Sequence, residues 1–302
     1  MNRIRWIVRQ IQFLLWRVRN HLNPPTPWDG NHHPAILRIE PWRGEADGEF
    51  CVDFLGVRTD PGFRSFFKPT PKGNLETSHP VPDQTYFEYI CLLDSIAAAA
   101  GPVYTVLELG AGYGYWLVSA SRALSLRPDL TPRMVGVEME ATRFRRMQEH
   151  FRNNGLNPEA HTLLSGAISD HDGTASYRVD ENEGEDYGLS LDRLHSAKKV
   201  VPVSCMRLGP ILNQQDQVDL LHMDLQGEEL KVIRDARAEI NSRVRHLIIG
   251  THSVSIHRGI RKLLLEDGWC LRFDYMGKGE RRTEFGTILF VDGLLAAQRP
   301  AL

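Results

Sequence analysis

The 302-residue sequence contains few cysteines and no excess of positive charge. The cysteines are far apart and form no Cys-x-x-Cys pair; they are Cys51, Cys91, Cys205 and Cys270. This spacing argues against a zinc site or a disulfide framework and favours reduced thiols in a cytoplasmic protein. The formal net charge of −2 argues against a nucleic-acid binder that relies on overall positive charge. No apolar stretch is long enough to span a bilayer.

The first 22 residues carry a basic amphipathic pattern, with arginines, no acidic residue and one aliphatic stripe at helical spacing. Arg9 interrupts the apolar run, which disfavours a signal peptide. Two interpretations of the predicted helix stay open. It lies on anionic lipid at the inner membrane face, or it packs its stripe on the domain or on a second copy of the chain. We favour packing, because amphipathic helices usually bury their stripe. Residues 23–27 then end the helix as a Pro-rich linker, so that residues 1–27 form one segment.

The rest of the chain divides into a small β-rich cap, residues 28–82, and a main domain, residues 83–302. In the cap, strand-like pieces fall at 36–39 and 50–57. In the main domain a helix over 83–100 precedes alternating strand and helix patterns. The strand patterns fall at 103–109, 134–138, 160–168, 217–223, 244–250, 269–275 and 285–291, and the helical ones at 113–126, 141–153, 226–240 and 254–267.

This alternation predicts an α/β fold with a doubly wound, mostly parallel, Rossmann-like sheet of seven strands. The last two strands are joined by a polar turn at 277–280 and predict an antiparallel hairpin at the sheet edge. Between the third and fourth strands lies an insertion, residues 172–205, with a strand at 173–179 and an acidic mobile loop at 180–186. The layout resembles the class I methyltransferase fold more than that of nicotinamide-dependent enzymes.

A glycine loop follows the first strand of the main domain and includes Glu108, Gly110, Ala111, Gly112 and Gly114. Glycines allow a sharp turn and let a ligand approach main-chain N–H groups closely. The helix that follows adds a positive partial charge at its N-terminus, which suits a carboxylate. A dinucleotide-binding loop prefers its third glycine one position later, where this sequence has Tyr115.

Glu138 ends the second strand, 24 residues after Gly114. A carboxylate at this point accepts hydrogen bonds from the ribose hydroxyls of a bound adenosine. The alternative is that Glu138 only neighbours the start of the next helix; the glycine loop favours ribose binding. Together the loop and Glu138 predict a cofactor that contains adenosine.

Residues 218–230 resemble the fourth strand of FkbM-family methyltransferases, which reads roughly I-D-L-L-K-I-D-V-E-G-x-E. The matching positions are Asp219, Asp224, Gly227 and Glu229, whereas Gln226 and His222 replace the commoner Glu and Lys. The resemblance covers roughly residues 85–292 and includes 166–173, where we assign Ala167 to the cofactor site. It implies S-adenosylmethionine as cofactor, held in part by Glu108 and Asp224. It also implies O-methylation of a hydroxyl on a sugar, glycan or secondary metabolite.

A hydroxyl is a poor nucleophile until its proton leaves, so a base or a metal is needed. We predict His252, which follows the fifth strand, as the general base, because imidazole titrates near neutrality. As an equal alternative, His252 only caps the helix that starts near Ser253, or it binds the methyl acceptor. Asp224 then orients His252, or binds Mg²⁺ together with Glu229 in a metal-assisted variant that we do not favour. His222 is predicted to be a buried strand residue.

Two other functions fit parts of the pattern. An NAD-dependent oxidoreductase shares the adenosine-binding features but predicts a different glycine spacing and parallel end strands. A binding protein that kept the fold and lost the chemistry is the non-enzymatic alternative. Six residues of the cap either line the pocket of the methyl acceptor or serve as packing and surface residues: Trp42, Arg43, Phe63, Phe66, Phe67 and Lys68.

Overall fold

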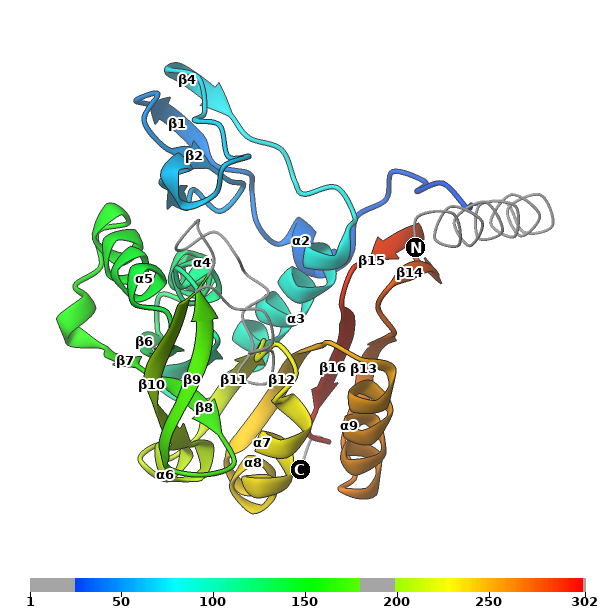
Figure 1. Cartoon of the computed structure of the whole chain (residues 1–302). Coiled ribbons are helices and arrows are strands. Elements are labelled where there is room, and N and C mark those ends of the chain that lie inside the picture. The colour runs from blue at the N-terminus through cyan, green and yellow to red at the C-terminus, as the bar shows by residue number, and fades with distance from the viewer. Residues whose placement is uncertain (1–24, 180–198, 301–302) are drawn as a thin grey trace, which may run out of the picture.

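The computed structural model describes residues 25–179 and 199–300 (Figure 1). The predicted N-terminal helix over 1–22 and the acidic loop at 180–186 lie outside these residues. Within the described part of the chain, none of the helices has the length and apolar character needed to cross a membrane.

The main domain is built on one seven-stranded mixed sheet with the order β7–β6–β5–β11–β12–β16–β13. The strands are β5 (Val103–Leu109), β6 (Thr131–Glu138), β7 (Thr162–Ser165), β11 (Val218–Met223), β12 (Val244–Thr251), β13 (Cys270–Tyr275) and β16 (Gly293–Gln298). The five strands from β7 to β12 are parallel, and β16 runs antiparallel to both β12 and β13. The predicted α/β sheet with a closing antiparallel pair is confirmed.

Helices cover both faces of this sheet, as a doubly wound fold requires. One core cluster joins α3 (Gln84–Ala98), α4 (Tyr115–Ala123) and α5 (Ala141–Asn153) to one set of strand side chains. The other joins α6 (Leu208–Asn213), α7 (Glu229–Asp235), α8 (Arg237–Arg243) and α9 (Val254–Glu266) to the alternate set. In β16, for example, Leu294 and Ala296 face the first cluster, and Leu295 and Ala297 face the second. This two-sided burial explains why the central strands read as continuous apolar runs.

The predicted helix over 226–240 is wrong at its start and in its continuity. Gln226 and Gly227 have φ values of 52° and 121°, which no right-handed helix contains. Helix α7 therefore begins only at Glu229 and ends at Asp235. Ala236 separates it from the next helix, α8, which begins at Arg237.

The prediction of 285–291 as the last sheet strand is wrong. That region forms β15 (Gly286–Phe290), which pairs with β14 (Gly279–Thr283) in a separate two-stranded hairpin. The last sheet strand is β16. The burial patterns give the reason: β15 alternates between buried and more exposed residues, whereas the first five residues of β16 are all buried, as in an interior strand.

The predicted strand over 160–168 is split at Gly166 into β7 and β8 (Ala167–Ser169). Strand β10 (Lys199–Arg207) packs closely against Gly166: a Cβ at this position would lie 2.6 Å from the side chain of Met206 in β10. With the predicted strand β9 (Gly173–Val179), β8 and β10 form a three-stranded sheet; β10 is absent from the sequence prediction.

The cap contains two strand pairs, β1 (Arg43–Ala46) with β4 (Gly73–Glu76) and β2 (Cys51–Val52) with β3 (Arg58–Thr59). The predicted strand at 36–39 is wrong. Residues Pro34–Leu37 form the short helix α2, because His33 caps the N–H of Ala35 and Pro34 favours the first helical turn. Asn154 anchors the cap to α5 through two hydrogen bonds of 2.9 Å with the backbone of Arg58.

Candidate functional site

The predicted site residues gather at one edge of the sheet, where the parallel strands β5, β6, β11 and β12 have their carboxyl ends. Open α/β sheets bind ligands at this edge. The glycine loop follows β5, Glu138 ends β6, Asp224 follows β11 and His252 follows β12. The shared strand direction therefore brings together four segments that are separated in sequence.

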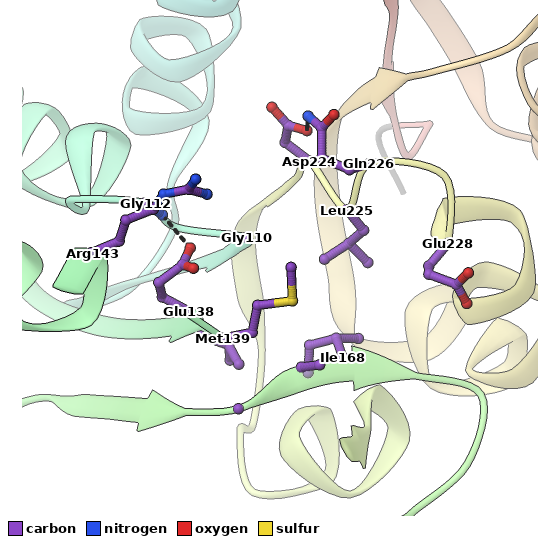
Figure 2. A pocket seen from close by; sticks show the side chains of 13 residues that line it. Gly110, Gly112, Glu138, Met139, Arg143, Ile168, Asp224, Leu225, Gln226 and Glu228 are labelled. Atoms are coloured by element: carbon purple, nitrogen blue, oxygen red, sulfur yellow. Dashed lines mark hydrogen bonds between the residues drawn. The ribbon is translucent and has the colours of Figure 1, made fainter. Parts of the chain in front are cut away.

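An inner pocket of about 580 Å³ opens between these strand ends (Figure 2). Five predicted cofactor residues line it: Gly110, Gly112, Glu138, Ala167 and Asp224. Its apolar lining includes Met139, Ile168 and Leu225, whose side chains converge on the space in Figure 2. The sequence prediction missed these three residues and Arg143. For Met139, Ile168 and Leu225 the only sequence signal is position: just after strand β6, within β8 and just after Asp224, respectively.

The glycine loop approaches the chain after β11 too closely for any other residue at its first glycine. Gly110 has a φ of 73°, and a Cβ there would lie 1.9 Å from the carbonyl oxygen of Asp224. Gly114 is the left-handed N-cap residue of α4 and packs against Met147 of α5. It does not line the inner pocket, nor the larger cleft described below. Glycine is needed at both positions, for backbone packing as well as for conformation.

Glu138 is buried and points at the glycine loop. Its Oε2 accepts a hydrogen bond of 2.7 Å from the N–H of Gly112 (Figure 2). Its Oε1 accepts one of 2.8 Å from the N–H of Glu140. Burial raises the pKa of Glu138, and the charge of Arg143 and these amide donors oppose that effect. The carboxylate is thus held in place at the wall of the inner pocket.

Glu108 is also buried, and it binds the N-terminus of α4. Its carboxylate accepts hydrogen bonds from the N–H groups of Leu117, at 3.1 Å, and Trp116, at 3.4 Å. Burial raises the pKa of Glu108 to about 7, against the opposing charge of His222 and the two amide donors. These helix N-terminal donors, which the sequence suggested for a ligand carboxylate, are therefore occupied by the protein itself.

A larger cleft lies between the cap and the main domain and contains about 2150 Å³ of open space. It shares Gly110, Gly112 and Asp224 with the inner pocket, so the two spaces meet at these residues. We call it the cap-side cleft. Glu108 and Ala111 line it. Of the cap residues suggested for an acceptor pocket, Phe66 and Phe67 line the cleft, whereas its lining does not include Trp42, Arg43, Phe63 or Lys68.

An acid–histidine pair that the sequence did not predict lies on the wall of the cap-side cleft. His222 Nε2 is 3.0 Å from Glu88 Oε2, and both residues line the cleft. His222 is 6% exposed, which fits the prediction of a buried strand residue. Burial lowers its pKa, but the contact with Glu88 and the nearby charges of Glu108 and Asp224 outweigh this and raise the pKa. The only sequence signal for Glu88 is its place on the polar side of α3 with Gln84 and Thr85.

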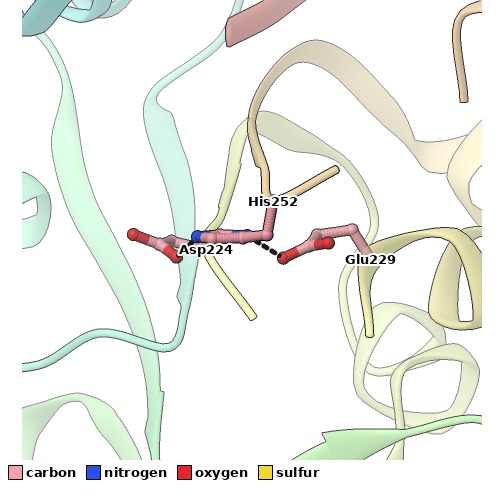
Figure 3. Close-up of side chains that lie close together, drawn as sticks. All are labelled: Asp224, Glu229 and His252. Atoms are coloured by element: carbon pink, nitrogen blue, oxygen red, sulfur yellow. Dashed lines mark hydrogen bonds and ion pairs between the residues drawn. The ribbon is translucent and has the colours of Figure 1, made fainter. Parts of the chain in front are cut away.

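Asp224, His252 and Glu229 form a row in which the imidazole lies between two carboxylates (Figure 3). His252 Nδ1 is 2.7 Å from Glu229 Oε1, and His252 Nε2 is 3.3 Å from Asp224 Oδ1. Burial lowers the pKa of His252, but Glu229, Asp224 and Asp292 together raise it above its usual value. The predicted partnership of Asp224 with His252 is thus present, and Glu229 contacts the opposite ring nitrogen.

Access to this row differs along its length. Asp224 lines both the inner pocket and the cap-side cleft. His252 lines neither; it borders a small separate cavity of about 250 Å³, and its side chain is 9% exposed. Glu229 is fully buried. Of the three, only Asp224 can therefore touch ligands in both spaces.

A family model of the FkbM methyltransferase domain matches residues 108–269, more than half of the chain. The chain belongs to the FkbM methyltransferase family. A protein of Jannaschia sp. (strain CCS1), provisionally named a methyltransferase, is 28% identical over 238 residues, covering 74% of this chain and 83% of that protein.

Two methyltransferases are among the solved structures similar to this FkbM-family chain. The FkbM methyltransferase of Methylobacillus flagellatus KT is 12% identical with a TM-score of 0.42, covering 72% of this chain and 56% of that one. The METTL16 methyltransferase domain is 11% identical with a TM-score of 0.45, covering 82% and 75%. The family assignment makes the chain a methyl-transfer enzyme.

Proposed function

We propose that this FkbM-family protein is an S-adenosylmethionine-dependent O-methyltransferase that acts on a hydroxyl of a sugar, glycan or secondary metabolite. One observation carries the proposal: the inner pocket and the cap-side cleft meet at Gly110, Gly112 and Asp224. Methyl transfer requires the donor and the acceptor to be held in line and in contact. Two pockets that meet at the same residues can hold the two molecules in this way.

The inner pocket suits the adenosine end of the cofactor. A carboxylate has room for about four hydrogen bonds, so Glu138 can accept the ribose hydroxyls while it keeps its two amide donors. Met139, Ile168 and Leu225 supply apolar surface for the adenine ring.

The methionine end would then lie over the glycine loop with its sulfonium beside Asp224, where opposite charges attract. Because Glu108 occupies the N–H groups of Trp116 and Leu117, the cofactor carboxylate needs other donors than these two. Glu108 acts on the cofactor indirectly, by fixing the glycine loop relative to α4.

We place activation of the acceptor hydroxyl at Asp224 and His252. Asp224 faces both spaces, and His252 stands behind it, 3.3 Å from its Oδ1. The general-base role predicted for His252 therefore has to act through Asp224.

The cap-side cleft suits an acceptor with a ring or another apolar face. Its lining includes the aromatic side chains of Phe66, Phe67, Tyr113, Tyr115 and Trp116. Aromatic rings offer large apolar faces, and tyrosine adds a hydroxyl for hydrogen bonding to a polar acceptor.

Isothermal titration of the full-length protein with S-adenosylmethionine, S-adenosylhomocysteine and NAD tests the cofactor. We expect the first two to bind and NAD not to bind. Replacing Glu138→Ala should weaken binding of both by at least about tenfold, since it removes charged hydrogen bonds to ribose. Glu149→Ala, an exposed change on α5, is the control and should leave the affinity unchanged. Binding of NAD in place of the other two would refute the proposed cofactor.

Transfer of a radiolabelled methyl group from S-adenosylmethionine to extracted glycans and small metabolites tests the reaction. The labelled product should be an ether, stable to mild base, and Asp224→Asn should abolish its formation while S-adenosylhomocysteine, which carries no sulfonium charge, still binds. Cofactor binding without transfer to any fraction would instead indicate a binding protein that lost the chemistry.

A further inference from the structure

The Nε2 atom of His252 has an unusual environment for a buried nitrogen. It is inaccessible to solvent and finds no hydrogen-bond partner among the described residues. Carboxylate oxygens nevertheless surround it: Asp224 Oδ1 at 3.3 Å and Asp292 Oδ1 at 3.9 Å. Buried polar atoms are almost always paired, so an orphan atom beside two carboxylates points to a missing group.

Glu229 determines which ring nitrogen of His252 is available. Its Oε1 accepts hydrogen bonds from the N–H groups of Leu225 and Gly227, at 3.1 and 3.0 Å, and lies 2.7 Å from His252 Nδ1. Because Oε1 already acts as an acceptor toward two amide N–H groups, Nδ1 carries the proton in this contact. A cation at Nε2 has to displace the proton that the neighbouring carboxylates favour on the ring, and the neutral ring then presents its Nε2 lone pair toward Asp224 and Asp292. A carboxylate that fixes a histidine in this way is the usual outer partner of a metal-binding imidazole.

We propose that this protein binds one divalent transition-metal cation between His252 Nε2 and the carboxylates of Asp224 and Asp292, with Glu229 orienting the imidazole. The side chains of Asp224 and Asp292 are 44% and 37% exposed, which gives a cation a route to the site. Glu229 lies on the opposite side of the ring and is therefore not a ligand, in contrast to the sequence-based alternative of Mg²⁺ held by Asp224 and Glu229.

The spacing of His252 Nε2 and Asp224 Oδ1 fits one cation. A cation about 2.1 Å from each of two ligand atoms holds them roughly 3.0 to 3.5 Å apart. The distance of 3.3 Å from Nε2 to Asp224 meets this without movement. Asp292 lies 3.9 Å from Nε2 and is not among the ligand atoms within 4.8 Å of both His252 and Asp224, so it has to move toward both before it can bind the same cation. Asp292 lies in the short connection between β15 and β16, where such a movement displaces no sheet strand.

The donor set selects the type of cation. Mg²⁺ and Ca²⁺ prefer oxygen ligands alone, whereas one imidazole with two carboxylates suits Mn²⁺, Fe²⁺, Co²⁺ or Zn²⁺. If the proposed O-methyl transfer is correct, a cation beside Asp224 lowers the pKa of the acceptor hydroxyl. The hydroxyl proton leaves to solvent, the C–O bond forms, and the C–S bond breaks with its electron pair remaining on sulfur.

The test uses full-length protein treated with a chelator and dialysed, then titrated with MnCl₂ and followed by electron paramagnetic resonance and calorimetry. Wild type should bind one Mn²⁺ per chain, and Zn²⁺ should displace it. His252→Gln should abolish binding, and Asp292→Asn, at a half-exposed position that tolerates substitution, should weaken it by about tenfold or more. His150→Gln is the matched control, because it alters a buried histidine of α5 whose ring nitrogens contact Thr59 and Tyr113 instead, and it should bind Mn²⁺ like wild type.

Failure of the metal site and failure of the proposed function give different results. Wild type that binds neither Mn²⁺ nor Zn²⁺, or His252→Gln and Asp292→Asn proteins that bind Mn²⁺ as wild type does, would overturn the metal site. Full methyl transfer by chelated protein would also overturn its catalytic role and leave the O-methyltransferase intact. Mn²⁺ binding without any affinity for S-adenosylmethionine would refute the proposed function alone. Transfer that is lost on chelation and restored by Mn²⁺ is the expected result.

Discussion

Glu108 provides the sharpest test of the electrostatics of the site. It is a buried carboxyl whose pKa is raised from 4.5 to about 7, mainly by burial. Between these two values the unfolded chain carries a charged Glu108 while the folded protein keeps it protonated. Glu108 therefore contributes most to stability below pH 4.5, and this contribution is lost as the pH rises through 7.

The size of the effect follows from the shift. One pKa unit corresponds to about 1.4 kcal/mol, so a rise from 4.5 to about 7 removes roughly 3 kcal/mol in full. Over the practical window from pH 5 to pH 8 the loss is about 2.5 kcal/mol. Glu108→Gln keeps an acceptor oxygen for the α4 amides but cannot ionise. The free energy of unfolding of the variant relative to wild type should therefore rise by about 2.5 kcal/mol across that window.

Urea unfolding of both proteins at pH 5 and pH 8, without ligand, gives their free energies of unfolding. The quantity to compare is the difference between variant and wild type at the two pH values. Any constant effect of the substitution on packing cancels. Glu45→Gln, an exposed carboxyl on β1, is the control and should change the value by less than about 0.5 kcal/mol. If Glu108→Gln gives the same relative stability at both pH values, burial does not keep Glu108 protonated and the argument fails.

Three further substitutions test other contacts. Gly110→Ala should destabilise the protein by about 2 kcal/mol more than Gly155→Ala in thermal unfolding, because both glycines have a φ of 73° but only Gly110 lacks space for a Cβ. Burial lowers the pKa of His150 to about 4. The free energy of unfolding of wild type should therefore fall by about 2.5 kcal/mol relative to that of His150→Asn as the pH falls from 8 to 4.5. Urea midpoints of the two proteins that change equally with pH would contradict this. Asp219→Ala leaves the N–H of Thr105 unpaired and should lower stability by about 1–3 kcal/mol with cofactor affinity unchanged; weakened cofactor affinity in calorimetry would argue for a role beyond packing.

The sequence predicts best what depends on local pattern and strand direction. Gly110, Gly112, Glu138 and Asp224 each end a strand or follow one, and parallel strands bring such positions to one edge. The helix over 141–153 is found with the predicted bounds, because its apolar spacing is regular.

Contacts between distant segments could not be predicted in the same way. Glu88 and His222 are 134 residues apart and meet only once α3 packs on the sheet. Glu108, predicted at the cofactor, lines the cap-side cleft and also accepts hydrogen bonds from two amides of α4; nothing in the sequence predicts this second contact. The same limit applies to β15 and β16, whose roles depend on which of two adjacent apolar segments enters the sheet.

The wall shared by the inner pocket and the cap-side cleft has a consequence for the order of events in time. Under the proposed function, a cofactor bound over Gly110, Gly112 and Asp224 becomes the floor of the cleft. The acceptor therefore meets its complete binding surface only after the cofactor has entered, and turnover follows a fixed sequence. The methylated product leaves first and S-adenosylhomocysteine leaves last. The spent donor then competes directly with fresh donor for the empty enzyme, so the rate responds to the ratio of the two.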